Sequence, residues 1–168
     1  MTEYYKIPFQ ATIYSKLRSF QFKINHNILY CNKKLYQISK SDTDKCTFCN
    51  EHIEDPIHLF TKCTKIKPIW KLVLENLLDP YGIKSLSDTE IILGVTKPEK
   101  VNNIVNHIII ETKYYIYVCK LEKTTPDFAR LKNRIKITEY IERQIAYKKN
   151  KVDRHDYKWH HLLNYLLG

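Results

Sequence analysis

Glycine is scarce in this sequence: 3 of its 168 residues are glycine and 6 are proline. Such a shortage favours helices joined by short connections. Long apolar runs are also missing, since none reaches the roughly 18 residues that a membrane span needs. The first ten residues, MTEYYKIPFQ, lack the apolar stretch of a secretory signal. We therefore expect an intracellular protein, in the nucleus or the cytoplasm, that does not associate with a membrane.

Negative charge is under-represented, with 18 acidic against 28 basic residues and a net charge of +10. The excess lies at both ends: residues 1–40 and 111–168 each carry a net +6, whereas residues 41–110 carry −2. Two basic flanks favour a polyanionic partner, with nucleic acid first and a membrane surface second. The alternative is a lysine-rich surface that serves solubility alone.

Apolar residues recur at helical spacing along most of the chain. In residues 12–31 the predicted apolar face consists of Ile13, Leu17, Phe20, Ile24 and Ile28. Further helices are predicted over residues 65–78, after Ser87, and over residues 100–122, 127–149 and 152–167. The stripe on residues 100–122 is so wide that we expect burial on more than one side. The predicted fold is a mostly α helical bundle with one small irregular Cys/His element, divided into residues 1–80 and a basic helical region, residues 81–168.

Residues 46–63, CTFCNEHIEDPIHLFTKC, hold three of the five cysteines and two of the seven histidines. A chain without a secretory signal keeps its thiols reduced, so these cysteines are expected to be ligands before disulfides. A Cys-x2-Cys turn presents two thiolates to one cation, and a following His and Cys can complete the site. The predicted set is Cys46, Cys49, His58 and Cys63, a closed tetrahedral Cys3His site that suits zinc and has a structural role.

Other histidines and cysteines compete with this assignment. His52 lies closer to Cys49 and could replace His58, which is preferred because apolar residues around it indicate a packed helix. Cys31 and Cys119 lie on apolar helix faces and are expected in the core. No cysteine is accompanied by a glycine-rich oxyanion loop or a nucleophile motif, which disfavours a catalytic thiol.

The order of these motifs resembles the zinc-binding region that follows the polymerase domain in non-LTR (LINE-type) retrotransposon reverse transcriptases. In that family a K-L-R-x-F-Q-x-K segment precedes the cysteines, as residues 16–23 do here. A C-x2-C, E-x3-H-L-F-x2-C and W pattern follows, which the four ligands, Glu54 and Trp70 match. The family often has Glu-Thr before the His, where this chain has residues 54–56, Glu-Asp-Pro. The match covers about residues 12–72, and beyond residue 100 it is weaker.

The resemblance implies a C-terminal fragment of a retrotransposon polyprotein that binds RNA or DNA beside the polymerase. No paired-carboxylate signature for two Mg²⁺ ions is found, since Asp42 and Asp44 fit a polar turn. We therefore expect no enzymatic activity from this chain. A closed metal site makes a hydrolase a distant alternative.

Nucleic-acid affinity would come from cations that neutralise phosphates, helped by aromatic rings that stack on bases. Tyr114, Tyr117 and Tyr147 are candidates for stacking, although packing in the core is the commoner role for tyrosine. The candidate cations flank the Cys/His segment: Lys16, Arg18, Lys23, Lys33, Lys34, Arg130, Lys132, Arg134, Lys136, Arg143, Lys148 and Lys149.

A zinc-stapled protein-interaction module is the second functional hypothesis. Such a module would dock onto the polymerase body or onto a second copy of the chain. Its contact surface would be the wide apolar face of residues 100–122 together with residues 159–166. A continuous basic surface would favour nucleic acid instead.

Overall fold

The structure is a computed structural model that describes residues 2–97 and 101–167. Within these residues there is no β-strand, and a single isolated bridge pairs Lys45 with Ile53. The predicted mostly α fold is therefore confirmed. No helix among the described residues is long and apolar enough to cross a membrane. The α-helices are α1 (Thr2–Ala11), α2 (Ser15–Asn25), α3 (Asn32–Gln37), α4 (Lys67–Val73), α5 (Asp88–Leu93), α6 (Asn102–Glu122), α7 (Phe128–Lys148) and α8 (Val152–Leu167).

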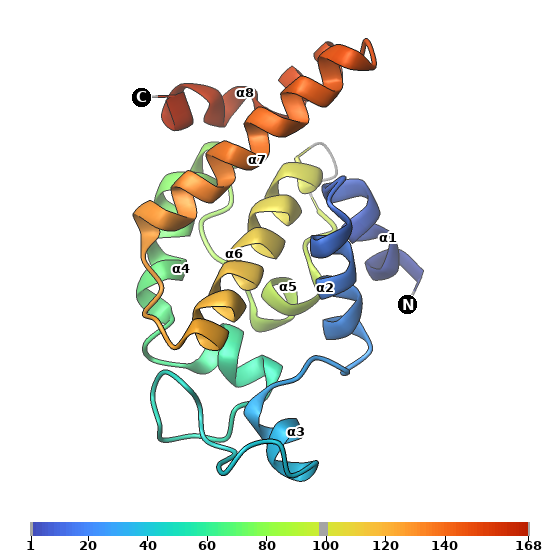
Figure 1. Cartoon of the computed structure of the whole chain (residues 1–168). Helices are drawn as coiled ribbons and strands as arrows, with labels where there is room; N and C mark the ends of the chain where they lie inside the picture. Colours follow the sequence, from blue (N-terminus) through green and yellow to red (C-terminus); the bar gives the residue numbers. More distant parts are fainter. Residues whose placement is uncertain (1, 98–100, 168) are drawn as a thin grey trace.

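Helix α6 lies at the centre of the bundle (Figure 1). Helices α1 and α2 pack against one side of it, and α7 crosses another side before turning back into α8. Side chains from several faces of α6 are buried, among them Val105, Ile108, Ile109 and Ile116. The predicted burial of this helix on more than one side is confirmed.

The first helical region differs from the prediction for residues 12–31. Helix α2 covers only Ser15–Asn25, and a separate helix, α1, precedes it. Leu17, Phe20 and Ile24 are buried as predicted, whereas Ile13 and Ile28 are 46% and 43% exposed. Both lie beyond the ends of α2, because the Thr12 side chain accepts the Tyr14 N–H and the chain turns at Asn27, which has a φ of 53°.

Several helix ends follow the signals in the sequence. Pro68 stands in the first turn of α4, where its missing N–H costs nothing. Ser87 and Glu90 form the predicted capping box at the start of α5. Helix α4 is shorter than residues 65–78, since it passes into a π-turn at Leu74–Leu78 and a 3-10 turn at Asp79–Tyr81.

One hydrophobic core extends from Ile7 to Leu166 and includes residues on both sides of position 80. Gly94, which has a φ of 106°, lets the chain approach α6 closely: a Cβ there would lie 2.8 Å from Asn106 Oδ1. The Asn106 side chain binds both the N–H and the C=O of Val95, at 2.7 Å each. Residues 1–80 and 81–168 therefore share their packing.

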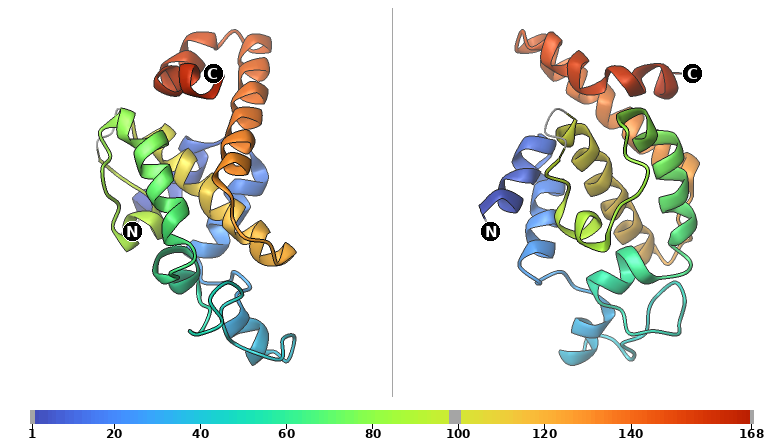
Figure 2. Two further views of the ribbon diagram at one scale, coloured as in Figure 1. Left: turned by 90° about the vertical axis from the view of Figure 1, so that its left-hand side faces the viewer. Right: turned by 180° about the vertical axis from the view of Figure 1, so that it is seen from behind.

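Residues 31–66, here called the Cys/His element, lie at one end of the bundle (Figure 2). They contain α3, an irregular loop and the π-turn His58–Lys62. No side chain of α3 is fully buried. Leu59, Phe60 and Ile66 at its end belong to the core, but between residues 32 and 53 Cys46 alone is buried. The order of residues 32–53 therefore has to come largely from interactions other than a hydrophobic core.

Candidate metal centre and nucleic-acid interface

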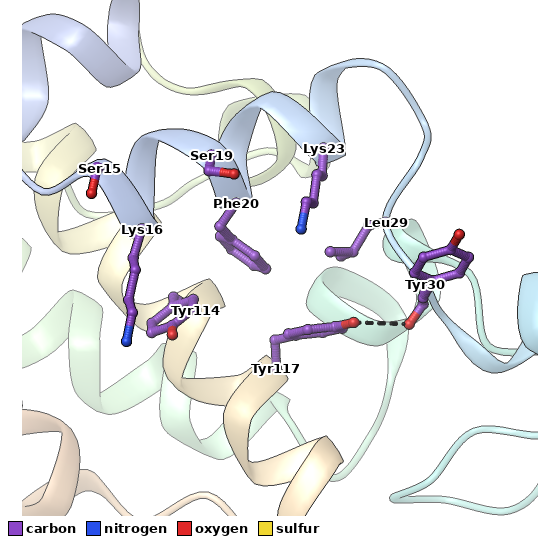
Figure 3. A pocket seen from close by; sticks show the side chains of 9 residues that line it. All are labelled: Ser15, Lys16, Ser19, Phe20, Lys23, Leu29, Tyr30, Tyr114 and Tyr117. Carbon is purple, nitrogen blue, oxygen red and sulfur yellow. Dashed lines mark hydrogen bonds between the residues drawn. The ribbon is translucent and has the colours of Figure 1, made fainter.

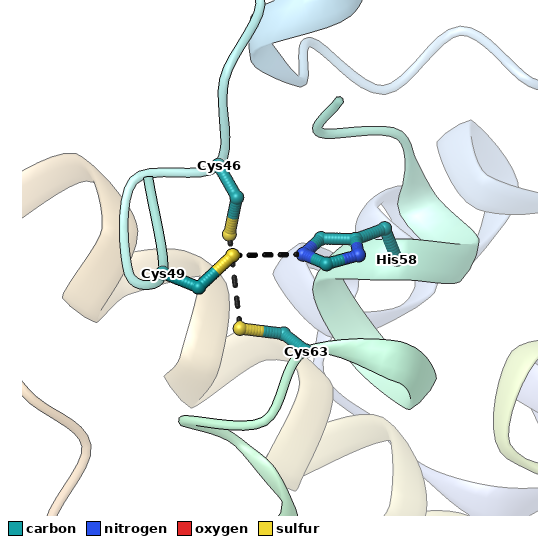
Figure 4. Close-up of side chains that lie close together, drawn as sticks. All are labelled: Cys46, Cys49, His58 and Cys63. Atoms are coloured by element: carbon teal, nitrogen blue, oxygen red, sulfur yellow. Dashed lines mark hydrogen bonds between the residues drawn. The ribbon is translucent and has the colours of Figure 1, made fainter. Parts of the chain in front are cut away.

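Four donor side chains meet in the Cys/His element (Figure 4). Cys46 and Cys49 come from the loop, His58 from the start of the π-turn and Cys63 from its end. The Cys46 and Cys63 sulfurs are 3.8 Å apart, and the Cys49 sulfur is 3.4 Å from His58 Nε2. All four donor atoms lie within 4.8 Å of one another, so the group could hold a metal ion.

These separations fit one tetrahedral ion. With metal–sulfur bonds of about 2.3 Å, the edge between two sulfurs is about 3.8 Å, and with a metal–nitrogen bond of about 2.05 Å the sulfur–nitrogen edge is about 3.6 Å. The observed separations, 3.8 and 3.4 Å, match both edges. A disulfide would need a sulfur–sulfur distance of about 2.05 Å, and all five cysteines are free.

The loop with the first two cysteines turns backbone N–H groups towards their sulfurs. Cys46 accepts hydrogen bonds from the backbone of Phe48 and Cys49, and Cys49 accepts them from Glu51 and His52. Asn50 makes the turn possible, since its φ of 59° lies in the left-handed region that asparagine tolerates. Hydrogen bonds from N–H groups favour the thiolate, the form that binds a cation.

The π-turn His58–Lys62 brings the other two donors together. Its backbone bond runs from the Cys63 N–H to the His58 carbonyl, five residues back, at 2.9 Å. Residues five apart on an ordinary α-helix point in different directions, because each residue turns by about 100°. The wider turn, started by Asp55 Oδ1 accepting the His58 N–H at 2.8 Å, places both donors on the metal side.

The thiols respond differently to their surroundings. Burial raises the pKa of Cys46 to about 12 and also raises that of Cys63. Burial acts in the same direction on Cys49, but the N–H groups of Glu51 and His52 outweigh it and lower the pKa to about 6. A divalent cation bound here would allow all three groups to be thiolates at once, because its charge offsets their mutual repulsion.

A buried charge pair fastens the Cys/His element to the bundle. The Glu54 carboxylate accepts the N–H groups of Asn32 and Thr47, at 2.9 and 2.8 Å. Lys120 of α6 lies 3.4 Å from Glu54 Oε1 and donates to Asn32 Oδ1 at 3.1 Å. Sequence reasoning placed Glu54 in the motif but missed this role; a lysine on the buried helix α6 was the one available signal.

Aromatic packing holds the π-turn from the other side. Leu59 and Phe60 are fully buried, and the Phe60 ring meets Phe20 of α2 edge-on, with ring centroids 6.0 Å apart. The Trp70 indole N–H donates to the Phe60 carbonyl at 2.7 Å. The backbone that carries His58 and Cys63 is thereby fixed against α2 and α4.

The competing cysteines and histidine are also placed. Cys31 and Cys119 are buried apart from the cluster, as predicted for core residues. His52 is exposed, with its ring stacked on His58 at a centroid distance of 5.2 Å. With Cys49 and Glu51 it forms a second, more exposed group of donor atoms.

Two predicted cations and two predicted tyrosines line one hollow of about 390 Å³ between α2 and α6 (Figure 3). Lys16 and Lys23 come from α2, Tyr114 and Tyr117 from α6, and Tyr30 from the segment before α3. We call this hollow the tyrosine–lysine groove. Sequence reasoning missed Tyr30, because only the fold brings it beside α6, where the Tyr117 hydroxyl donates to its carbonyl at 3.1 Å.

The other predicted cations are spread more widely. Arg134 pairs with the buried Glu111 at 2.9 Å and lies over the Tyr114 ring, while Lys34 lies over the Tyr30 ring. Arg18 donates to the backbone carbonyls of Phe9 in α1 and of Thr12 just after it, and so has a structural role. Lys132 lies over the Tyr165 ring, and Arg143 pairs with Glu139. The remaining predicted cations are exposed: Lys33, Arg130, Lys136, Lys148 and Lys149.

Comparison with protein-family models, with curated proteins and with solved structures finds no match for this chain. The resemblance drawn from the sequence therefore rests on the motif of residues 16–70 alone.

Proposed function

We propose that this chain is a zinc-stapled module that binds RNA or DNA through the tyrosine–lysine groove and carries out no chemistry of its own. The observation that supports this most is the convergence of Lys16, Lys23 and three tyrosines on one hollow. Lysines there can neutralise consecutive phosphates, and tyrosines offer flat faces to unpaired bases. The expected ligand is a single strand or an unpaired region, bound with low sequence specificity.

Zinc is the proposed metal because three sulfurs and one imidazole in a closed tetrahedron are the donor set that it prefers. All four positions are filled by the chain, so the ion has a structural role. Its position matters for the groove, since Tyr30 precedes the element that the metal orders. In peptides, structural zinc contributes roughly 10–16 kcal/mol of apparent folding free energy.

The cellular setting we propose follows the resemblance to LINE-type reverse transcriptases. In that setting the module would hold RNA or DNA beside the polymerase. Two residues of the shared pattern, Glu54 and Trp70, support the backbone of the metal centre, which gives a physical reason for their place in the motif.

Fluorescence anisotropy with a labelled single-stranded RNA tests the groove. For the variant Lys16→Ala/Lys23→Ala, the slope of log affinity against log salt should become shallower by about 1.4, since each phosphate contact on a single strand contributes about 0.7. Tyr30→Ala should weaken binding by about 1–3 kcal/mol and leave the slope unchanged. The matched control is Lys67→Ala/Lys71→Ala on α4, where two exposed lysines lie outside the groove.

Two results would contradict the proposal. One is an affinity that does not change between about 50 and 200 mM salt, because phosphate contacts release counterions. The other is an equal loss in the groove variant and the α4 control, which would mean that binding follows net charge alone.

The protein-interaction hypothesis relied on exposed apolar residues of α6 and α8. The apolar face of α6 is buried in the core, as are Trp159, Leu162 and Leu166 of α8. An interaction module would have to use other residues. A change of mass with concentration in sedimentation, unaffected by the groove variant, would favour it over nucleic-acid binding.

A further inference from the structure

A second hollow lies between α1, the start of α6 and the α7–α8 hairpin. Its volume is about 610 Å³, and it shares no lining residue with the tyrosine–lysine groove. Small-molecule sites commonly occupy about 300–1,000 Å³, so this size suits a compact organic ligand. We call this hollow the basic cavity.

Positive charge dominates the wall of the basic cavity. Glu142 is the one carboxylate among its described lining residues, and it already accepts hydrogen bonds from Lys158 at 2.8 Å and from the Trp159 indole at 2.9 Å. Both bonds reach Oε2, whereas Oε1 has no hydrogen-bond partner among the described residues and lies 3.7 Å from His107 Nδ1. The lining side chains still carry a net positive charge, because five cations face this one carboxylate. The cationic lining residues are Arg18, Lys149, Lys151, Arg154 and Lys158.

Three of these cations lie close together in sequence where α7 passes into α8. In the described part of the chain, none of Lys149, Lys151 and Arg154 takes part in an ion pair. Like charges held on one wall repel one another, and an anion between them relieves that repulsion. Arginine and lysine together are the side chains that proteins use to bind phosphate.

Aromatic side chains form the other part of the wall. The rings of Phe9 and Tyr157 are each 66% exposed although both line the cavity, and the Arg18 guanidinium lies 5.2 Å from the centre of the Phe9 ring. Tyr81 is 93% buried, and among the described residues its hydroxyl has no hydrogen-bond partner. The wall thus offers aromatic faces beside the cations, and the Tyr81 hydroxyl is one of its polar groups without a hydrogen-bond partner.

We propose that the basic cavity binds a nucleoside phosphate, with the phosphate on the cations of the α7–α8 junction and the base against Phe9 and Tyr157. Two sources carry this chemistry: a free nucleotide, or the phosphorylated 5′ end of a strand. The site does not depend on the function proposed for the groove, because the two share no residue.

Isothermal titration with AMP, adenosine and inorganic phosphate tests the proposal. AMP should bind once per chain and more tightly than either of its parts. The variant Lys151→Ala/Arg154→Ala should lower the affinity for AMP about 10-fold or more, since it removes two charge-assisted contacts. The matched control Lys136→Ala/Lys148→Ala removes two exposed charges of α7 outside the cavity and should leave the affinity unchanged.

A second pair of variants tests the aromatic wall without changing the charge. Phe9→Ala should weaken AMP and leave inorganic phosphate unaffected, whereas Phe22→Ala, an exposed phenylalanine outside the cavity, should change neither. Absence of AMP binding at millimolar concentration would overturn the proposal. So would equal weakening by the two charge variants.

Competition identifies the source of the ligand, and it is measured in the background of Lys16→Ala/Lys23→Ala so that the groove does not contribute. Displacement of AMP by a 5′-phosphorylated oligonucleotide, and not by its 5′-hydroxyl form, assigns the cavity to strand ends. Displacement by neither, with AMP bound, assigns it to free nucleotides. Equal displacement by both forms would contradict recognition of a phosphate.

Discussion

The Cys/His element and the α6–α7–α8 core both bury charged groups, but they hold them by different means. In the element, local backbone N–H groups bind the side chains of Cys46, Cys49 and Glu54, and four donor atoms form a group that could hold a metal ion. In the core, charges pair between helices and sit among buried apolar side chains: Glu142 with Lys158, and Glu111 with Arg134. The first region should therefore depend on metal and the second on packing.

The largest expected effect is removal of one ligand. Cys63→Ser should abolish metal binding and unfold the loop of residues 32–53, because about 10–16 kcal/mol of apparent folding free energy exceeds what this thinly packed loop can supply. Native mass spectrometry would report the metal, and hydrogen exchange would report protection in α6 and α7. Cys119→Ala, at a buried cysteine outside the cluster, is the control that should keep the metal.

Hydrogen-exchange protection of α6 and α7 in the Cys63→Ser variant tests whether the Cys/His element and the α6–α7–α8 core unfold independently. Retained protection in the metal-free variant would show that they unfold separately. Simultaneous loss would show that the two regions form one cooperative unit. A Cys63→Ser protein that still binds one metal ion per chain would contradict the ligand assignment itself.

Acid should lower the free energy of unfolding of the core, because His107 is buried there in its neutral form. Burial lowers the pKa of His107 to about 3, with Lys158 adding to the effect and Glu142 and the Ala11 carbonyl opposing it. Below about pH 6.5 the His107 imidazole is protonated in the unfolded chain but stays neutral in the folded chain. The free energy of unfolding should therefore fall as the pH drops towards 3. Between pH 6.5 and 4.5 the loss is about 2–3 kcal/mol. Urea unfolding at both pH values would measure it.

The Cys/His element is expected to lose its metal in acid as well, since its thiolates gain protons. Metal content is therefore followed in the same samples. His107→Asn, whose side-chain N–H can replace that of Nδ1 at the Ala11 carbonyl, should flatten the pH dependence of unfolding without changing metal release. An unchanged slope in that variant would assign the acid sensitivity to other groups.

The smallest expected effects come from two asparagines in the same left-handed conformation. Asn50 has a φ of 59° in the metal loop, and Asn150 has a φ of 52° between α7 and α8. Valine at either position should cost about 1–2 kcal/mol of stability, because its branched side chain disfavours this backbone. Asn50→Val should also weaken metal binding, measured by competition with a chelator, while Asn150→Val should not. Equal metal affinities of the Asn50→Val and Asn150→Val variants would show that the conformation of Asn50 does not contribute to metal binding.

The convergence of the four donor side chains could be predicted from the sequence because it is local: two turns supply all four, and the spacing is sufficient. The long helices could be predicted for the same reason, since the apolar periodicity of residues 100–122 and 127–149 matches α6 and α7 closely. Helix α1 was not predicted from the sequence. Pro8 is a residue that normally interrupts a helix, and the buried Ile7 does not by itself make an apolar stripe.

Long-range pairing is what the sequence did not reveal. Lys113 is fully buried, where its ammonium nitrogen donates to Gln21 and to the Ile92 carbonyl, and burial lowers its pKa well below the usual value. The apolar periodicity of residues 100–122 did not indicate this pairing. Ile13 and Ile28 misled in the opposite direction, because they continue a helical period beyond the ends of α2 and remain exposed. Such outcomes depend on which segments the fold brings together.

Helix α6 contacts both the tyrosine–lysine groove and the Cys/His element. The Tyr117 hydroxyl donates to the Tyr30 carbonyl in the groove, and one turn further along Lys120 contacts Glu54 of the element. Thermodynamic reciprocity then applies: if the bound ion tightens the groove around a strand by some factor, a bound strand tightens the grip on the ion by the same factor. At equilibrium, a chain with bound nucleic acid would then retain a metal ion against a higher concentration of chelator than a chain without it.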